Sequence, residues 1–459
     1  MKKPNILYIF ADQLRYDALA STGNKTVITP NIDKIADQGM VFDQAFSSCP
    51  VCTPYRGQLL TGLYSHQNGA IDNEYKIKTN ITTLPQALKA EGYHTGYVGK
   101  WHLGYGPYTE EKRYGFDYMA AYNCNHNYYN ISYHENEQGP IKVEGWGPEE
   151  ETSLAIKFIE EHEKMDKENP FVLLLSWGPP HHPYDKYPQE YNIYDSSKLD
   201  ISPNVPEYYE EIARKELADY YGNVTALDAQ MGRILKALDD MGLSENTILC
   251  FTSDHGDHIR SHGYAKCNDK IETDNTKRAS KATPFEESIH IPLIVRWPEK
   301  MKGGQRTSSL FNSVDIMPTL LSLCEIDIPD GVQGSNLSHV ILGGEGDVND
   351  SVYLQILGEG WPHRGKWVGY WRGVRTDKWL YARWYKNENG PLLFNIENDP
   401  YEMNNLYENP DYAETKDILE ARLKKWMEDT KDPFDTGERD PESGMLILGQ
   451  EFSNEKWIR

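Results

Sequence analysis

The 459-residue sequence predicts an α/β protein with a large, mostly parallel central sheet flanked by helices, followed by a smaller C-terminal antiparallel sheet with one helix. Two observations predict this fold class. Up to about residue 350, short apolar runs of the strand type alternate with longer helical patterns, the order in which βαβ units occur. Beyond residue 350, strand-like runs follow one another after short turns, which is typical of an antiparallel sheet.

The elements of the first part can be placed in chain order. We predict strands at 6–10, 94–98, 171–176, 247–253 and 291–297. We predict helices at 32–38, 84–91, 148–164 and 207–241. The last helix is the longest, and its apolar residues, including Leu217, Val224, Leu227 and Ile234, fall on one broad face. We therefore expect it to pack against the core.

After residue 350 the pattern changes, and predicted strands follow one another without intervening helices. Strands are expected at 351–357, 370–376, 379–384 and 392–396, followed by a helix at 412–427. The chain is long enough for two domains, or for one large domain with a satellite. We accordingly divide it into an N-terminal domain, 1–349, and a C-terminal subdomain, 350–459.

Composition excludes several classes of partner. Seventy acidic against 47 basic residues give a net charge of −23, which repels nucleic acid and anionic membranes at long range. No run of 18 apolar residues exists, so no membrane-spanning helix is predicted. A pocket that binds an anion must therefore be lined locally by positively charged groups.

The cellular location is read from the N-terminus and the cysteines. The apolar run 5–11 is too short for a signal peptide and continues directly into Asp12, so it indicates a first strand. Six cysteines along this length do not resemble a disulfide scaffold. A cytoplasmic location is favoured for the chain as given, and a periplasmic or secreted one if a signal peptide was removed.

The segment 52–62, CTPYRGQLLTG, predicts a short helix with chemistry at its N-terminus. Thr53 can cap it, Pro54 suits its first turn and Gly62 can end it. Cys52 then lies just outside the helix, where free N–H groups favour a thiolate or an anion. Arg56 lies one turn further on, so its cation can face the same point.

Polar side chains follow four of the predicted strands. These are Asp12 and Gln13, Lys100 and His102, His181 and His182, and Asp254 and His255. Ligands bind at the carboxyl ends of strands in open α/β sheets, so we expect these groups to meet Cys52 in one crevice. Carboxylate oxygens with a few neutral ligands suit a hard divalent ion, Ca²⁺ or Mg²⁺.

The residues 52–62 fill every specified position of C-x-P-x-R-x-x-x-x-T-G, and the chain thereby resembles the formylglycine-dependent sulfatases of the alkaline phosphatase superfamily. GKWHLG at 99–104, PHHP at 180–183 and NDPYE at 398–402 also resemble segments of that family. The resemblance covers nearly the whole chain, from residue 5 to about residue 406. It implies that Cys52 is converted to formylglycine, whose hydrated aldehyde is the nucleophile of a sulfuric ester hydrolase, and that 1–349 is the catalytic domain.

The resemblance also implies a site. Its catalytic residues would be Cys52, Arg56, Lys100, His102, His181 and Lys281. Its metal ligands would be Asp12, Gln13, Cys52, Asp254 and His255. Gln13 stands where the family usually has a second Asp, which removes one negative charge. Lys281 fits the family pattern K-x-x-x-[YF]-E-E-S, and Lys266 is its competitor because the segment between the two looks like an insertion.

The substrate class rests on aromatic side chains that lie among cations. A sulfated sugar requires flat apolar faces for its rings and cations for its anionic groups. The candidates are Asn73, His126, Arg364, Trp367 and Arg372. We therefore expect the substrate to be a sulfated carbohydrate or another small sulfate ester.

Alternatives stay open at this point. Phosphonate monoester and phosphodiester hydrolases share the scaffold and the nucleophile, and choline-sulfatase-like enzymes look similar. A non-enzymatic binding protein would have the fold with Cys52 unconverted. Cys49 and Cys52 also form a C-x-x-C, which could be a redox pair or half of a zinc site. The expected partners are a formylglycine-generating enzyme during maturation and, in an oligomer, further copies of the chain.

Overall fold

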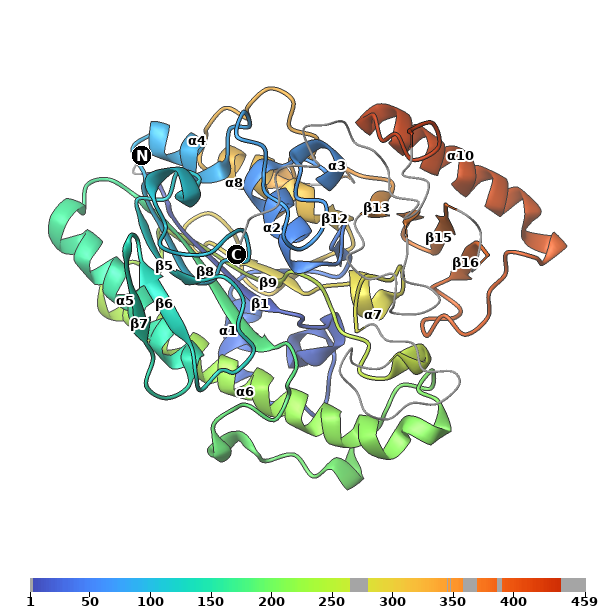
Figure 1. The fold of residues 1–459 in the computed structure, drawn as a ribbon, viewed down its shortest axis with the longest axis horizontal. Coiled ribbons are helices and arrows are strands. Elements are labelled where there is room, and N and C mark those ends of the chain that lie inside the picture. Colours follow the sequence, from blue (N-terminus) through green and yellow to red (C-terminus); the bar gives the residue numbers. More distant parts are fainter. Residues whose placement is uncertain are drawn as a thin grey trace.

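The computed structural model describes residues 3–264, 280–344, 346, 348–357, 370–385 and 390–438. Its centre is a ten-stranded sheet in the order β11-β2-β10-β9-β1-β8-β4-β5-β6-β7. A four-stranded sheet, β13-β14-β15-β16, lies beside it, and β3 pairs with β12 in a small two-stranded sheet. The predicted fold class is confirmed (Figure 1).

The strands are β1 Asn5–Asp12, β2 Met40–Phe42, β3 Ala45–Phe46, β4 His94–Lys100, β5 Tyr118–Tyr122, β6 Ser132–Glu135, β7 Gln138–Lys142, β8 Phe171–Pro180, β9 Thr247–Ser253, β10 Leu293–Arg296, β11 Gln305–Thr307, β12 Phe311–Asn312, β13 Val352–Ile356, β14 Trp371–Arg375, β15 Trp379–Trp384 and β16 Leu392–Asn395. The α-helices are α1 Pro30–Asp37, α2 Cys52–Thr61, α3 Ser65–Asn68, α4 Leu84–Ala90, α5 Gly147–Asp166, α6 Glu210–Asp240, α7 Glu286–Ile289, α8 Ile316–Leu323, α9 Ser338–Ile341 and α10 Ala413–Thr430.

The middle of the large sheet is parallel. Strands β9, β1, β8, β4 and β5 run in the same direction, and antiparallel pairing begins only at β10 on one side and at β6 on the other. Every residue of β1, β8 and β9 is buried, which is expected of parallel strands covered on both faces. This burial explains why these strands are continuous apolar runs in the sequence.

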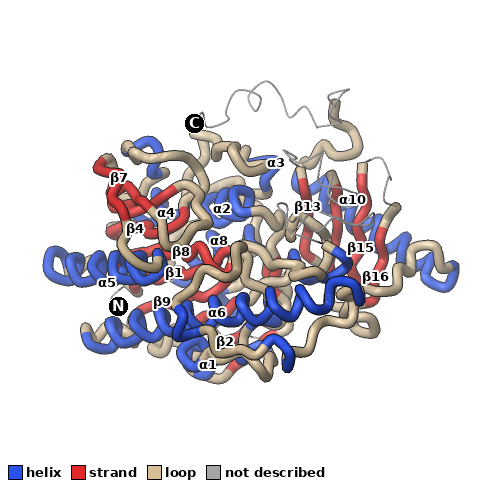
Figure 2. The backbone as a smooth tube through the Cα atoms, turned by 60° about the horizontal axis from the view of Figure 1, so that its bottom comes forward, coloured by secondary structure: helices blue, strands red, loops and turns tan. Residues whose placement is uncertain are grey.

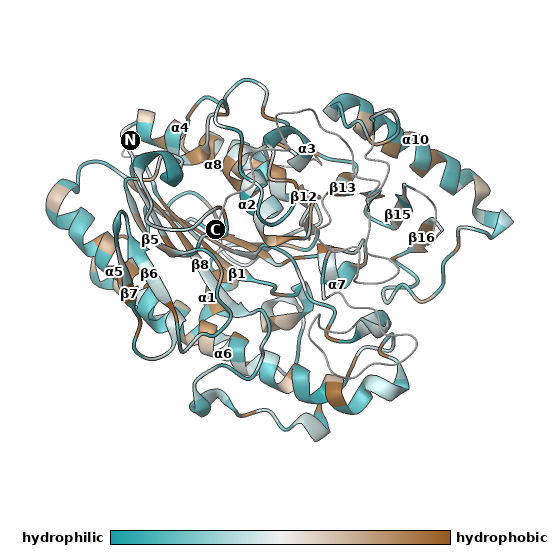
Figure 3. Cartoon of the chain, viewed as in Figure 1, coloured by the Kyte–Doolittle hydropathy of each residue, from teal (hydrophilic) through white to brown (hydrophobic). Residues whose placement is uncertain are grey.

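Helices cover both faces of the large sheet, as Figure 2 shows for α1, α5 and α6 on one side and α2 and α4 on the other. Alternate residues of β1 serve the two faces. Leu7 and Ile9 pack in the cluster beneath α5 and α6, whereas Ile6 and Tyr8 pack in the cluster beneath α2, α4 and α8. In Figure 3 the central strands are brown, while the outward turns of the covering helices are largely teal.

The C-terminal sheet is covered by α10 on its outer face, through Leu419, Leu423 and Met427. Its inner face shares a cluster with Phe46 and Phe285 of the preceding part of the chain. The two parts therefore pack on a common apolar cluster. We retain 1–349 and 350–459 as a proposed division.

The small helix at the chemical segment differs in one detail from the prediction. α2 begins at Cys52 itself, and its N-cap residue is Val51. Thr53 does not cap the helix, because its hydroxyl donates to the carbonyl of His102 at 2.6 Å. Gly62 ends the helix in the left-handed conformation, as predicted, with φ 63°.

Within the described ranges, no helix combines the length and the apolar character that a bilayer crossing requires.

Candidate active site

The thiol of Cys52 lies in the first turn of α2, and every residue of this helix is buried. Gly57 lets the helix approach its neighbours closely, since a Cβ atom there would lie 2.6 Å from the Cβ of Ala70. The free N–H groups at the start of the helix and its dipole favour negative charge at residue 52. Tight packing thus fixes residue 52 at the carboxyl edge of the sheet.

Four groups from four parts of the chain surround the sulfur of Cys52. Lys281 Nζ lies at 3.2 Å, His255 Nε2 at 3.4 Å, Lys100 Nζ at 3.6 Å and Asp12 Oδ1 at 3.7 Å. Asp12 and Lys100 end strands β1 and β4, and His255 follows β9. The expected convergence at the strand ends is what the structure shows.

Arg56 contacts groups from four strand regions that surround this cluster. One guanidinium nitrogen, Nη1, donates to Tyr97 Oη at 2.7 Å, to the Lys100 carbonyl at 2.6 Å and to Ser176 Oγ at 2.9 Å. The other, Nη2, lies 3.8 Å from Asp12 and 3.7 Å from Asp254. The buried arginine therefore ties α2 to the ends of β1 and β4, to the middle of β8 and to the residue that follows β9.

Potential metal ligands converge at the same place. Ligand atoms of Asp12, Cys52, Asp254 and His255 all lie within 4.8 Å of one another, and all four residues are buried. His255 Nδ1 lies 3.0 Å from the carbonyl of Gly256, so Nδ1 carries the proton and Nε2 presents its lone pair. The Gln13 backbone N–H donates to Asp254 Oδ1 at 2.9 Å, which places Gln13 beside the group.

The cluster shifts the acidity of its members. Burial and Asp12 raise the pKa of the Cys52 thiol, but Lys100, Lys281 and His255 outweigh them and hold it well below its ordinary value. Burial likewise raises the pKa of Asp12, yet the neighbouring cations, with Lys100 first, keep it well below the usual range. The site is a positive island that stabilises an anion at residue 52.

Three predicted histidines line one side of the cluster. The ring of His126 stacks on that of His181, with centroids 3.9 Å apart. Burial, with His126 next, holds the pKa of His181 well below its ordinary value, so this ring is neutral at neutral pH. Burial also lowers the pKa of His102, whose backbone has a φ of 52°.

The remaining predicted residues do not all join the cluster. Asn73 lies at the start of α2, where its side-chain oxygen accepts the N–H of Thr53 at 3.3 Å. Arg372 is fully buried, and its guanidinium is held by Asp432 at 2.7 Å and by the carbonyl of Ile356 at 2.7 Å. Its predicted role as a substrate-binding residue is therefore not supported, because its cation stabilises the C-terminal sheet. Arg364, Trp367 and Lys266 lie outside the described residues.

Two residues at the site were not predicted. Asp257 contacts the side chain of Gln13, and Cys124 lies 3.3 Å from His126 Nε2. The sequence held a signal for Asp257, since it follows Asp254 and His255 in the same strand-end loop. Among the described cysteines, Cys49 and Cys52 are buried free thiols.

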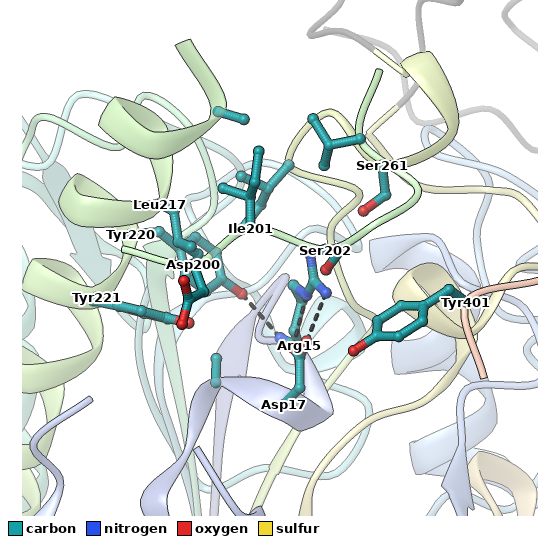
Figure 4. A pocket seen from close by; sticks show the side chains of 14 residues that line it. Arg15, Asp17, Asp200, Ile201, Ser202, Leu217, Tyr220, Tyr221, Ser261 and Tyr401 are labelled. Carbon is teal, nitrogen blue, oxygen red and sulfur yellow. Dashed lines mark hydrogen bonds and ion pairs between the residues drawn. The ribbon is translucent and has the colours of Figure 1, made fainter. Parts of the chain in front are cut away.

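A cavity of about 180 Å³ lies beside the loop that follows β1, and Figure 4 shows its lining. Arg15 and Asp17 form an ion pair in it at 2.6 Å. The hydroxyl of Tyr220 accepts the N–H of Arg15 at 2.9 Å and donates to the carbonyl of Gln13 at 2.6 Å. None of the predicted site residues lines this cavity, but its wall supports the backbone of Gln13.

Comparison with protein families decides the identity of this site. The model of the family described as Sulfatase matches residues 4–326, which include the whole cluster around Cys52. The chain belongs to the sulfatase family. A second model, described as N-sulphoglucosamine sulphohydrolase, C-terminal, matches residues 279–429. The prediction of a sulfuric ester hydrolase is confirmed.

Relatives of this sulfatase match nearly its whole length. An ulvan-active sulfatase of Formosa agariphila is 34% identical over 94% of this chain and 82% of its own. The structure of a protein in complex with its substrate D-glucosamine-2-N,6-O-disulfate is 24% identical, with a TM-score of 0.84, and covers 95% of this chain and 100% of that one. A phosphonate monoester hydrolase of Agrobacterium radiobacter has the same fold, at 21% identity and a TM-score of 0.74, with 97% and 99% covered.

Sulfatases generally depend on formylglycine and on a metal ion, and the residues present fit such an ion. Buried Asp254 Oδ2 and Gln13 Oε1 have no hydrogen-bond partner within the described part of the chain. Carboxylate and amide oxygens together with one imidazole suit a hard divalent cation. The cluster of Asp12, Cys52, Asp254 and His255 is therefore a possible binding site for such an ion.

Proposed function

We propose that this sulfatase hydrolyses sulfate esters of carbohydrates, with residue 52 as its nucleophile after conversion of Cys52 to formylglycine. The observation that carries the proposal is the position of residue 52. It lies between two lysine ammonium groups, at 3.2 and 3.6 Å, and a group of metal-type ligands. A tetrahedral anion that binds here meets positive charge on several sides.

Conversion is supported by the sequence that surrounds Cys52. The segment 52–62 has the complete signature of the modified cysteine, and a formylglycine-generating enzyme is the partner that would act on it. Because Cys52 is fully buried in the fold, we expect this enzyme to act before the chain folds. The hydrated aldehyde supplies two hydroxyl groups on one carbon, one to attack sulfur and the other to expel sulfate afterwards.

The metal ligands in this proposal are Asp12, Gln13, Asp254, His255 and residue 52. Four of them bring oxygen atoms once Cys52 is converted, which favours Ca²⁺ or Mg²⁺ over zinc. The bound ion would supply positive charge that polarises the sulfate group and lowers the pKa of the nucleophile. Arg56, at 3.8 Å from Asp12 and 3.7 Å from Asp254, offsets part of the negative charge of these carboxylates.

Lys100 and Lys281 are proposed to bind the sulfate oxygens. Burial lowers the pKa of both amines, but nearby anions raise it above the ordinary value, Asp12 for Lys100 and Cys52 followed by Asp12 for Lys281. Asp12 is still present after conversion of Cys52 and continues to favour the charged form of both amines. Their charges are pre-organised, since Lys100 is fully buried and ion-paired to Asp12. Such groups stabilise the charge that develops in the transition state without reorganising.

Proton transfer is assigned to Lys281, His181 and His102. Lys281 is charged and can protonate the leaving alcohol. His181 Nδ1 donates its proton to the carbonyl of His182 at 2.7 Å. Its Nε2 is therefore the ring nitrogen that can exchange a proton with the reacting groups. The lowered pKa of His102 makes it neutral at neutral pH, and a neutral imidazole can accept the proton of the second hydroxyl group.

A carbohydrate substrate is supported by the similarity to the ulvan-active sulfatase, which extends over 94% of the chain. In this proposal His126 and Asn73 line the entrance to the site. His126 stacks on His181 and can present an imidazole face or edge to a sugar hydroxyl. Because His126 lies next to His181, a proposed proton-transfer group, we expect it to contact the leaving group of the substrate.

The test uses protein that is co-expressed with a formylglycine-generating enzyme. Sulfate release from a panel of sulfated sugars is compared with cleavage of an aryl phosphonate and an aryl phosphodiester. We expect efficient release of sulfate from at least one sugar. Faster cleavage of the phosphonate or the diester than of every sulfate ester would overturn the proposal and leave the metal and nucleophile assignments in place.

A further inference from the structure

We infer that Asp257 is a positioning residue, which turns the side-chain amide of Gln13 so that its oxygen faces the metal. The inference rests on the proposed metal site and goes beyond it. It concerns a residue that is not itself a proposed ligand. An aspartate at position 13 would offer an oxygen in either orientation of its carboxylate, whereas the amide of Gln13 offers its oxygen in only one. The inference explains how that one orientation is selected.

The nitrogen of the Gln13 side-chain amide has hydrogen-bond partners, whereas its oxygen has none among the described residues. Its nitrogen, Nε2, donates to Asp257 Oδ2 at 2.5 Å and to Ser280 Oγ at 3.2 Å. Its oxygen, Oε1, is buried and has no hydrogen-bond partner among the described residues. An amide has two donors and one acceptor group, so the carboxylate decides which end faces the ligand cluster. A buried acceptor without a partner is costly unless a cation completes its environment.

Asp257 is itself held in one orientation. Its Oδ1 accepts the N–H of Ile259 at 3.0 Å, and its Oδ2 accepts the hydroxyl of Tyr184 at 2.5 Å as well as the Gln13 amide. The Ile259 N–H can only donate, so the oxygen next to it must remain an acceptor. Asp257 is fully buried, as is Gln13. Neither side chain can relax into solvent.

The backbone of Gln13 is fixed independently of its side chain. Its φ is 69°, in the left-handed region, which a residue other than glycine adopts only when its surroundings impose it. Its N–H is held by Asp254 and its carbonyl by the hydroxyl of Tyr220, at 2.9 and 2.6 Å. With both backbone groups fixed, the remaining freedom lies in the side-chain torsions, and the contacts of Nε2 with Asp257 and Ser280 fix the end of that side chain and the orientation of its amide.

The test exchanges donor and acceptor across this contact. In Asp257→Asn the side-chain oxygen stays on the Ile259 N–H, so an NH₂ group faces Gln13 and favours the flipped amide. We expect the affinity for Ca²⁺, and in parallel for Mg²⁺, to fall at least tenfold, as for other residues that orient metal ligands. Affinity is measured by calorimetric titration of chelator-treated protein, which needs no turnover.

A second substitution restores the match. In Gln13→Glu/Asp257→Asn the introduced carboxylate accepts from the NH₂ group and keeps one oxygen for the metal. We expect this double variant to regain at least tenfold in affinity over Asp257→Asn. Gln13→Glu alone places two carboxylates in contact, so it should not gain in the same way. The comparison is a double-mutant cycle, in which independent effects would simply multiply.

Tyr184→Phe is the matched control. It removes another hydrogen bond to the same oxygen of Asp257 but cannot turn the Gln13 amide, so we expect a change in affinity below threefold. Melting in the presence of chelator establishes that each variant is folded, and Gln13→Glu tests the contact from the other side if Asp257→Asn does not fold. Wild-type affinity in Asp257→Asn, or no rescue in the double variant, would overturn the inference. No binding by the wild type would overturn the proposed metal site itself.

Discussion

At the scale of single residues, the chemistry depends on charge brought close to Cys52. Lys281 Nζ lies 3.2 Å from both Cys52 Sγ and His255 Nε2. It reaches this point from the loop before α7, where Ala282 has a φ of 67°. The family pattern around residue 281 predicted this lysine, and Lys266 was its alternative. Substitution can separate the two.

We predict that Lys281→Ala lowers kcat/KM by about 10²-fold or more, because removal of one pre-organised electrostatic group from an active site has this effect. Lys266→Ala should retain activity within about threefold, the scatter expected of a residue outside the reacting groups. The measurement is sulfate release by each converted variant. A loss confined to Lys266→Ala would show that the assignment is reversed.

Residue-level prediction from sequence succeeded where spacing along the chain is meaningful and failed where it is not. Cys52 and Arg56 lie on one helix, so their spacing predicted their proximity. Asp257 and Gln13 are 244 residues apart, and although their strand ends were expected to meet, the sequence does not indicate which of the side chains there are in contact. Arg372 was predicted from its aromatic neighbours, but a buried carboxylate, Asp432, decides its role.

At the scale of elements, the ends of two adjacent strands hold the cationic groups in register. Gly99 precedes Lys100 at the end of β4 and has a φ of 101°. A Cβ atom at this position would lie 2.1 Å from the carbonyl oxygen of Ser176 on β8. Ser176 Oγ in turn accepts from Arg56. Close approach of the two strands therefore positions both Lys100 and Arg56.

We predict that Gly99→Ala lowers the free energy of unfolding by about 2–4 kcal/mol, from backbone strain together with overpacking. It should also lower kcat, because Lys100 moves away from residue 52. Gly242→Ala is the control, since Gly242 has a φ of 69° and nothing lies within 4 Å of the added Cβ. Its cost should be about 1–2 kcal/mol with unchanged kcat. Equal unfolding energies for the two variants, measured in urea, would refute the packing argument.

The elements themselves were predicted to different degrees. Buried parallel strands are continuous apolar runs, and the five predicted runs correspond to β1, β4, β8, β9 and β10. The hairpin of β6 and β7 was not predicted, because its residues are mostly exposed and lack an apolar pattern. Helix α8 was missed as well, since a short run that is apolar on all sides cannot be distinguished from a buried strand by periodicity.

At the scale of the whole molecule, a buried ion pair joins the C-terminal sheet to the segment after α10, and His66 of the N-terminal part contacts the same carboxylate. Asp432, just beyond α10, accepts from Arg372 of β14 at 2.7 Å and from Tyr353 of β13 at 2.8 Å. His66 of α3 lies 3.3 Å away. Burial raises the pKa of Asp432, but Arg372 and His66 outweigh it and lower the value to about 2.

We predict that Asp432→Asn costs about 3–5 kcal/mol at pH 7, because it leaves the Arg372 charge buried without its partner. The pKa of this carboxyl is lower in the fold than its ordinary value of 3.8, so its stabilisation is present above that value and is lost as the pH falls through about 2. The difference in unfolding free energy between variant and wild type should therefore shrink from pH 5 to pH 2.

The control for this ion pair is Asp435→Asn. Asp435 pairs with Arg383 at 2.6 Å at the protein surface, where its side chain is 43% exposed. Exposed pairs contribute about 0–1 kcal/mol, so we expect only a small change. A loss for Asp435→Asn as large as that for Asp432→Asn would contradict the structural role assigned to the buried pair.

The overall charge of −23 and the cationic site have to be considered together. At long range the protein repels an anionic substrate, and attraction arises only within the short screening distance of Lys100, Lys281, Arg56 and the proposed metal. Recognition of a sulfate group is therefore a contact property of the cluster around residue 52.

The most direct test relates activity to the conversion of residue 52. Preparations are made with graded amounts of a formylglycine-generating enzyme. In each, the fraction converted at residue 52 is measured by peptide mass spectrometry, and sulfate release is measured on the best sugar substrate. We predict that the rate is proportional to the converted fraction and extrapolates to zero in its absence. A rate that does not change with conversion, or that persists in Cys52→Ala, would contradict the central claim that residue 52 is the nucleophile of this sulfatase.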